Sequence, residues 1–105
     1  MKSRGNARPV YVISIAADLT GLHPRTLRIY EEKGLVQPAR RNNSRLYSER
    51  DLERVRMIRH LTREVGLNLA GVRMFLEVYE RLEVRGSRDA VTWVIERTMR
   101  RRRVR

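Results

Sequence analysis

The sequence predicts a mostly α-helical fold of the winged helix-turn-helix class, with a further short helix at the C-terminus. Two short helical segments are joined by a tight turn at residues 21–23, as in a helix-turn-helix. A turn-rich segment over residues 36–47 follows and is typical of a β-hairpin. The remaining segments carry apolar residues at helical spacing, which predicts amphipathic helices packed on a small core.

The first short helix is expected to begin at Ser14, a good N-cap residue, and to end near Gly21. Its apolar side chains Ile15, Ala16 and Leu19 are predicted to face the core. Residues 10–13, just before it, form a short apolar run that fits either a strand or a packed lead-in.

The second short helix is expected to begin after His23, with Pro24 at its first position, where a missing N–H costs nothing. Gly34 ends it. Its inner face should carry Leu27 and Tyr30, which lie three positions apart. The outer face near its N-terminal end should then carry Arg25, Thr26, Arg28 and Ile29.

The predicted hairpin has a turn-forming tip at residues 42–44. Val36 on one side and residues 46–47 on the other are candidate strand residues. Behind it, Ser48 and Asp51 have the spacing of a capping box and predict the start of a third helix.

Three amphipathic helices are predicted after the hairpin, from apolar stripes of period 3.6. The first stripe comprises Leu52, Val55, Ile58, Leu61 and Val65. Gly66 ends that helix and Asn68 caps the next, whose stripe comprises Leu69, Val72, Phe75, Leu76 and Tyr79. Ser87 caps the last helix, whose apolar side comprises Val91, Val94, Ile95, Thr98 and Met99.

These segments predict three parts of the chain: a disordered basic arm over 1–9, a winged domain over 10–85, and a helix with a basic tail over 86–105. A helix of that length is marginal alone in water. Its apolar side therefore needs a partner, either a second subunit or the chain's own residues 76 and 79.

The net charge of +12 in 105 residues points to a polyanionic partner, nucleic acid ahead of membrane. The excess lies on the arm, on the hairpin and on the tail after residue 85, which includes four consecutive arginines at 100–103. That arginine run fits a phosphate clamp, a solvated helix end or a disordered end. Because the chain has no cysteine, disulfides and thiolate metal sites are excluded. No signal peptide or membrane-spanning run is recognisable, which favours a cytoplasmic protein.

Two arginine groups are candidate contacts to DNA. Arg25 and Arg28 lie in the first turns of the second helix, where a recognition helix meets base edges and Arg pairs with guanine. Arg40, Arg41 and Arg45 flank the hairpin tip, from which a wing reaches phosphates or a minor groove. The simpler alternatives are a helical hairpin with solvated arginines and a solvated basic loop.

Three segments together resemble the MerR family of transcriptional regulators over about residues 10–82. They read ISIAADLTG at 13–21, RTLRIYEEKGLVQP at 25–38 and RLYSERDL at 45–52. Within the family, YVIS at 11–14, GLHP at 21–24 and GLNLAGV at 66–72 are similar to the HspR branch of heat-shock repressors.

The resemblance implies a sequence-specific dimeric repressor of heat-shock genes that binds an inverted repeat through its second helix. The implied DNA contacts are Arg25, Thr26, Arg28, Tyr30, Arg40, Arg41, Arg45 and Tyr47. Ser14 and His23, at the starts of the two short helices, are further candidate contacts. The implied dimer contacts, on antiparallel C-terminal helices, are Val91, Val94, Ile95, Thr98 and Met99. It also implies a DnaK-type chaperone as co-repressor.

The chain departs from the family in two respects. Many members carry two adjacent tyrosines where this chain has Ile29 and Tyr30, which puts Ile29 in doubt as a contact. Many also carry a metal or ligand domain after the dimer helix, whereas only six residues follow Met99 here. We therefore expect no cofactor and no metal in this chain.

An enzyme is not expected, because no nucleophile–base pair, phosphate-binding glycine loop or metal spacing is present. His23 is interpreted as a helix cap or a phosphate-facing residue, and His60 as a surface or boundary side chain. An architectural or excisionase-like DNA-bending protein on the same fold remains the alternative. An RNA-binding domain is disfavoured, since the chain has one Phe and one Trp and no visible stacking platform.

Overall fold

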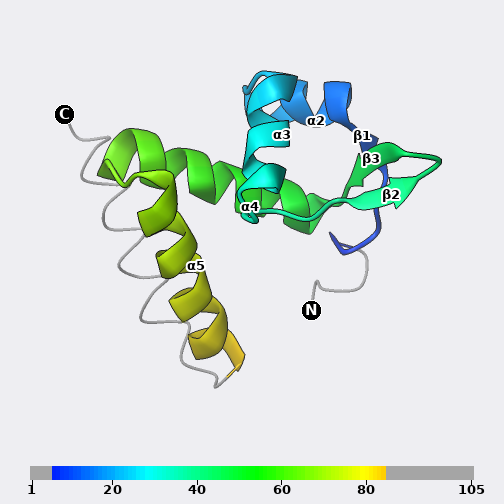
Figure 1. The fold of residues 1–105 in the computed structure, drawn as a ribbon. Coiled ribbons are helices and arrows are strands. Elements are labelled where there is room, and N and C mark those ends of the chain that lie inside the picture. Colours follow the sequence, from blue (N-terminus) through cyan, green and yellow to red (C-terminus); the bar gives the residue numbers. More distant parts are fainter. Residues whose placement is uncertain (1–5, 85–105) are drawn as a thin grey trace. The chain divides into compact units, whose positions relative to one another are not determined.

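The first part of the chain folds as the predicted helix-turn-helix with a wing (Figure 1). A computed structural model describes residues 6–84 and divides the chain into two units, Met1–Ile58 and Arg59–Arg105, which are treated separately below. In the first unit, helix α2 (Ile13–Thr20) and helix α3 (Pro24–Glu32) lie side by side and come, along the chain, between the first strand and the hairpin of a small sheet. The predicted fold class is therefore confirmed for the winged domain.

Helix α2 does not begin as the sequence predicted. Its N-cap is Val12, which makes no side-chain capping bond, and Ser14 lies in the first turn as an exposed residue. Its C-terminus is as expected, because Gly21 has a left-handed φ of 71° and its N–H bonds the carbonyl of Ala17. The N-terminus is thus set by the chain leaving the sheet rather than by a capping hydroxyl.

The buried side of α2 also differs from the prediction. Ala16, Ala17 and Thr20 are buried, whereas Ile15 and Leu19 are 44% and 47% exposed. Thr20 donates its hydroxyl hydrogen bond to the carbonyl of Ala16 at 2.8 Å, which satisfies that polar group inside the helix. Small side chains let α2 approach its neighbours closely, and the larger ones are left on the outside.

Helix α3 agrees with the prediction at both ends. The Nδ1 atom of His23 accepts a hydrogen bond from the N–H of Arg25 at 2.9 Å, and Pro24 occupies the first turn. Leu27 and Tyr30 are buried as expected. After Lys33, Gly34 adopts a φ of 76°, which turns the chain toward the sheet.

The wing is part of a three-stranded sheet, in the order β1-β3-β2. Strand β1 is Tyr11–Val12, β2 is Ala39–Arg41 and β3 is Ser44–Tyr47, and both pairings are antiparallel. The apolar run before α2 is therefore a strand. The hairpin turn consists of Asn42 and Asn43, whose φ values of 51° and 69° suit the type I′ turns of two-residue hairpins.

Val36 was predicted as a strand residue, but it lies outside β2 and is buried together with Leu35. The two residues serve the core, because Pro38 follows closely and cannot donate a ladder hydrogen bond. The wing is consequently shorter than residues 36–47 and begins at Ala39.

Helix α4 (Glu49–His60) begins with the predicted capping box. The Ser48 N–H donates to Asp51 at 2.9 Å, and the Asp51 N–H donates to the Ser48 hydroxyl at 3.0 Å. Leu52, Val55 and Ile58 are buried, as their spacing predicted.

The second unit starts with a turn that the sequence did not predict. The helix continues over Leu61–Val65 as a π-helix rather than as an α-helix, and Gly66 ends it with a φ of 92°. The wider π winding rotates the side chains out of the 3.6 register. As a result Leu61 is buried, whereas Val65 is 43% exposed and does not belong to the buried stripe.

Helix α5 (Leu69–Val84) is capped as predicted, because Asn68 Oδ1 accepts a hydrogen bond from the Gly71 N–H at 2.8 Å. Val72 and Leu76 are buried, and the rings of Phe75 and Tyr79 stack with centroids 6.3 Å apart. The predicted C-terminal helix, its dimer residues and the arginine tail lie outside the described residues. The predicted boundaries after residues 9 and 85 stay predictions. Within residues 6–84, no helix is long and apolar enough to cross a bilayer.

Candidate nucleic-acid interface

Helix α3 presents a cationic outer surface because its inner surface is firmly anchored. Leu27 has no exposed area and Tyr30 is 5% exposed, which fixes the rotation of the helix in the core. Arg25 and Arg28 are then exposed, and Thr26 is half-buried between them. This arrangement matches what base-edge recognition needs, namely long donors on a helix held rigidly from behind.

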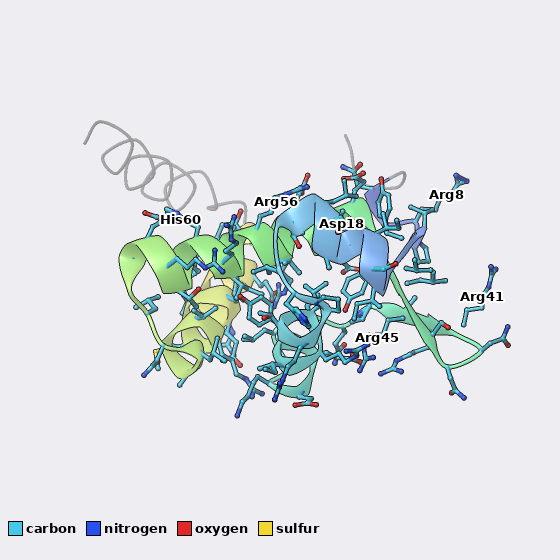
Figure 2. All side chains as sticks on the ribbon, turned by 90° about the horizontal axis from the view of Figure 1, so that it is seen from above. Arg8, Asp18, Arg41, Arg45, Arg56 and His60 are labelled. Atoms are coloured by element: carbon cyan, nitrogen blue, oxygen red, sulfur yellow. The ribbon has the colours of Figure 1, made fainter. Side chains whose placement is uncertain are left out.

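The three arginines of the wing are not equivalent. Arg41 is exposed beside the turn and extends away from the sheet (Figure 2). Arg40 and Arg45 are cross-strand partners in the sheet register, and both bind the carboxylate of Glu31 at the end of α3. Arg40 Nη2 lies 2.9 Å from Glu31 Oε2, and Arg45 Nε donates to Glu31 Oε1. The base of the wing is therefore tied to α3.

The pKa of Glu31 reflects its two bonds to Arg40 and Arg45. Burial acts to raise the pKa of Glu31, but the hydrogen bonds from Arg45 and Arg40 and their positive charges outweigh it, so that its pKa is lowered. The carboxylate is thus held ionised at neutral pH. Two of the three wing cations have a resident counterion in the protein.

Tyr47 lies beneath the wing rather than on it. Its side chain has no exposed area, and its hydroxyl is buried with no hydrogen-bond partner within the described residues. Burial raises the pKa of Tyr47, while the nearby Arg45 acts against that shift. Core packing covers the ring, and a contact from this hydroxyl to DNA, which the family resemblance implied, stays a prediction.

The remaining predicted contacts fall into two groups. Ser14 and His23 are exposed at the starts of α2 and α3, where a phosphate can approach them. Tyr30 is buried and acts first as a core residue. The role of each predicted residue in DNA binding stays a prediction.

Sequence reasoning did not identify Glu31 as part of the site. A signal for its position was present, because Glu31 lies four positions after the buried Leu27 and next to Tyr30, on the inner edge of α3. A carboxylate on such an edge needs a cationic partner. The identity of that partner depends on a hairpin register that no helical pattern contains.

Further hydrogen bonds brace the elements that carry the site. The Tyr11 hydroxyl on β1 donates to Glu49 at the start of α4 at 2.5 Å. The Arg54 Nε donates to the carbonyl of Leu35 at 2.5 Å, which secures the segment between α3 and the wing. These contacts join β1 and the segment that follows α3 to helix α4.

Comparison with known proteins identifies the family to which this fold belongs. A family model described as MerR HTH family regulatory protein matches residues 11–78. The chain belongs to the MerR family.

Among curated MerR relatives, the chain is 51% identical over 71 residues to a putative heat shock protein HspR of Streptomyces coelicolor, covering 67% of this chain and 47% of that protein. It is 40% identical over 81 residues to the transcriptional regulator GlnR of Bacillus anthracis, covering 76% of this chain and 62% of that one. The chain thus spans about half to three fifths of the length of these relatives.

Two solved structures share the fold. The lead(II) complex of the transcription regulator PbrR691 from Ralstonia metallidurans superposes with a TM-score of 0.63 at 28% identity, over 90% of this chain and 79% of that one. The MerR-family regulator HiNmlR, which lacks the sensor domain and is bound to promoter DNA, superposes with a TM-score of 0.68 at 21% identity, over 90% of this chain and 73% of that one. Both superpositions support the predicted fold independently of the sequence motifs.

Proposed function

We propose that this MerR-family chain is a sequence-specific DNA-binding transcriptional regulator that represses heat-shock genes as a dimer on an inverted repeat. The observation that carries the proposal is the presentation of Arg25 and Arg28 on a helix whose rear surface is buried, next to a wing whose tip arginine has no ion pair within residues 6–84. A solvated helical hairpin needs neither feature.

The heat-shock assignment has a separate support. The chain is 51% identical over 71 residues, 67% of its length, to a putative heat shock protein HspR. Repression, the inverted repeat and a chaperone co-repressor come from the resemblance to that branch, and each needs its own test. Localisation in the cytoplasm belongs to the same proposal.

The first experiment is selection of binding sites from random duplexes, followed by genome-wide mapping of bound sites. A two-fold symmetric motif that overlaps promoters of chaperone genes is expected, with transcription rising when the gene is deleted. Coverage of many unrelated sites without symmetry would instead indicate an architectural DNA-bending protein and contradict the proposal.

Variants of α3 test base readout. Arg25→Ala or Arg28→Ala should cost about 1–3 kcal/mol on the selected site and much less on random duplex. Arg73→Ala on α5 is the matched control, because it removes the same charge from an exposed arginine outside the winged unit. Equal losses on both duplexes would identify the two residues as phosphate clamps.

The dimer is tested through the apolar stripe of residues 91–99. A charge at Ile95, as Ile95→Asp, should halve the mass in sedimentation and abolish tight binding to the selected site, since each half-site supplies only part of the contact energy. A wild-type chain that is monomeric yet binds tightly would contradict the dimer. An unchanged mass with a lower melting temperature would show that the stripe packs within its own chain.

A further inference from the structure

One carboxylate holds two arginines that come from opposite strands of the wing. Arg40 and Arg45 face each other in the register of β2 and β3, and like charges directly opposite each other destabilise a strand pair. Glu31 contributes one oxygen to each of them, so that the pair becomes a bridged triad. The triad therefore links the hairpin to α3, because Glu31 on α3 supplies the negative charge that offsets the two arginines of the hairpin.

Within the triad the Arg40 side chain is 49% exposed, but the pair of Glu31 and Arg45 is not an ordinary solvated surface pair. The side chains of Glu31 and Arg45 are each 21% exposed, whereas the i,i+4 pair of Arg73 and Glu77 on α5 is 60% and 59% exposed. Solvent screens the second pair and leaves it with little influence on geometry. The first pair is sheltered enough to fix the direction of the wing relative to α3.

The triad also divides the cations of the wing. With Arg40 and Arg45 bound to Glu31, the tip residue Arg41 has no ion pair within residues 6–84. Figure 2 shows this difference, because Arg45 turns toward α3 while Arg41 extends from the hairpin. A phosphate that meets the wing would first meet Arg41.

We propose that Glu31 is a positioning residue for DNA recognition: it fixes the wing against α3 and withholds Arg40 and Arg45 from phosphates, leaving Arg41 as the phosphate contact. This inference rests on the proposed DNA-binding function. Its consequence is selectivity, since the protein sets the spacing between wing and α3 and limits charge that would bind any sequence.

The test compares Glu31→Gln with Glu32→Gln, which removes the same charge one residue away from an exposed side chain with no ion pair in the described part of the chain. Without DNA, the side-chain Nε–H of Arg45 is followed by NMR. It should be protected from exchange in the wild type and in Glu32→Gln, and lose protection in Glu31→Gln.

With DNA, affinity is measured against salt on the selected site and on a random duplex. Glu31→Gln should steepen the salt slope on random duplex by about 0.9 for each arginine released to a phosphate. Its preference for the selected site should fall several-fold, whereas that of Glu32→Gln should not. In the wild-type background, Arg41→Gln should flatten the slope by about 0.9, and Arg45→Gln by much less.

Three outcomes would overturn the inference: an Arg45 Nε–H that is equally protected in Glu31→Gln, equal DNA behaviour of the two glutamine variants, or an Arg45→Gln slope as flat as that of Arg41→Gln. Absence of any DNA binding by the wild type would overturn the proposed function instead. In that case loss of Arg45 protection would still establish that Glu31 fixes the wing, and retained protection would refute it.

Discussion

The two helices of the helix-turn-helix bury opposite kinds of side chain. α3 buries large residues, Leu27 and Tyr30, and exposes arginines, whereas α2 buries small residues and leaves Ile15 and Leu19 nearly half exposed. Helix α3, which is expected to touch DNA, is thus anchored by large buried side chains. Helix α2 is anchored by small side chains that let it pack closely against its neighbours. In this fold, apolar size alone does not tell which side of a short helix is inside.

The largest effect should come from truncating the anchor of α3. Leu27→Ala should lower the free energy of unfolding by about 2–5 kcal/mol, because it leaves a cavity under the helix. Leu19→Ala on α2 should cost about 0.5 kcal/mol or less, as at other exposed positions. Urea denaturation measures both, and equal losses would contradict the contrast between the helices.

Enlarging a small residue should be the second largest effect. Ala17 is 4% exposed, so Ala17→Leu should overpack the inner side of α2 and cost about 1–3 kcal/mol. Ile15→Leu on the outer side should be nearly neutral. A stable Ala17→Leu protein would show that α2 has room for a large side chain and that its small residues are incidental.

The caps of the two helices should differ more modestly. His23→Ala removes the side-chain acceptor at the start of α3 and should cost about 1 kcal/mol. Ser14→Ala should have little effect on stability, because no side chain caps α2. Thermal melts of the two variants give the comparison, and it fails if Ser14→Ala is the more costly change.

The smallest effect concerns pH. Because the folded pKa of Glu31 is lowered from 4.5, its ion pairs add stability that is fully present above that value and is lost as pH falls through the folded pKa. Glu31→Gln should therefore lose stability near neutral pH, and the gap to wild type should close in acid. Asp18→Asn on α2, an exposed position, is the control in a urea titration at several pH values.

The sequence was sufficient for most local signals, although the predicted cap at Ser14 did not form. The cap at His23, the capping box of Ser48 and Asp51, and the Asn68 cap each follow from a few neighbouring residues, and all three are present. The buried stripe of α4 follows from its period in the same way. Such features depend on backbone geometry that every helix shares.

The sequence was insufficient where a distant element decides. The sequence left open whether residues 10–13 form a strand, because β1 depends on its pairing with β3. The exposure of Leu19 likewise depends on the elements that pack beside α2. The π-helical turn after His60 breaks a period that looked continuous. The triad at Glu31 needs the hairpin register, so the pairing of Arg40 and Arg45 with Glu31 was visible only in three dimensions.

The cap at His23 has a consequence for the tautomer of this imidazole. Because Nδ1 accepts the hydrogen bond from the Arg25 N–H, it carries no proton in this structure. A neutral ring must then bear its proton on Nε2. The exposed start of α3 therefore presents a ring N–H donor to solvent, and an anion that approaches His23 there meets a donor rather than a lone pair.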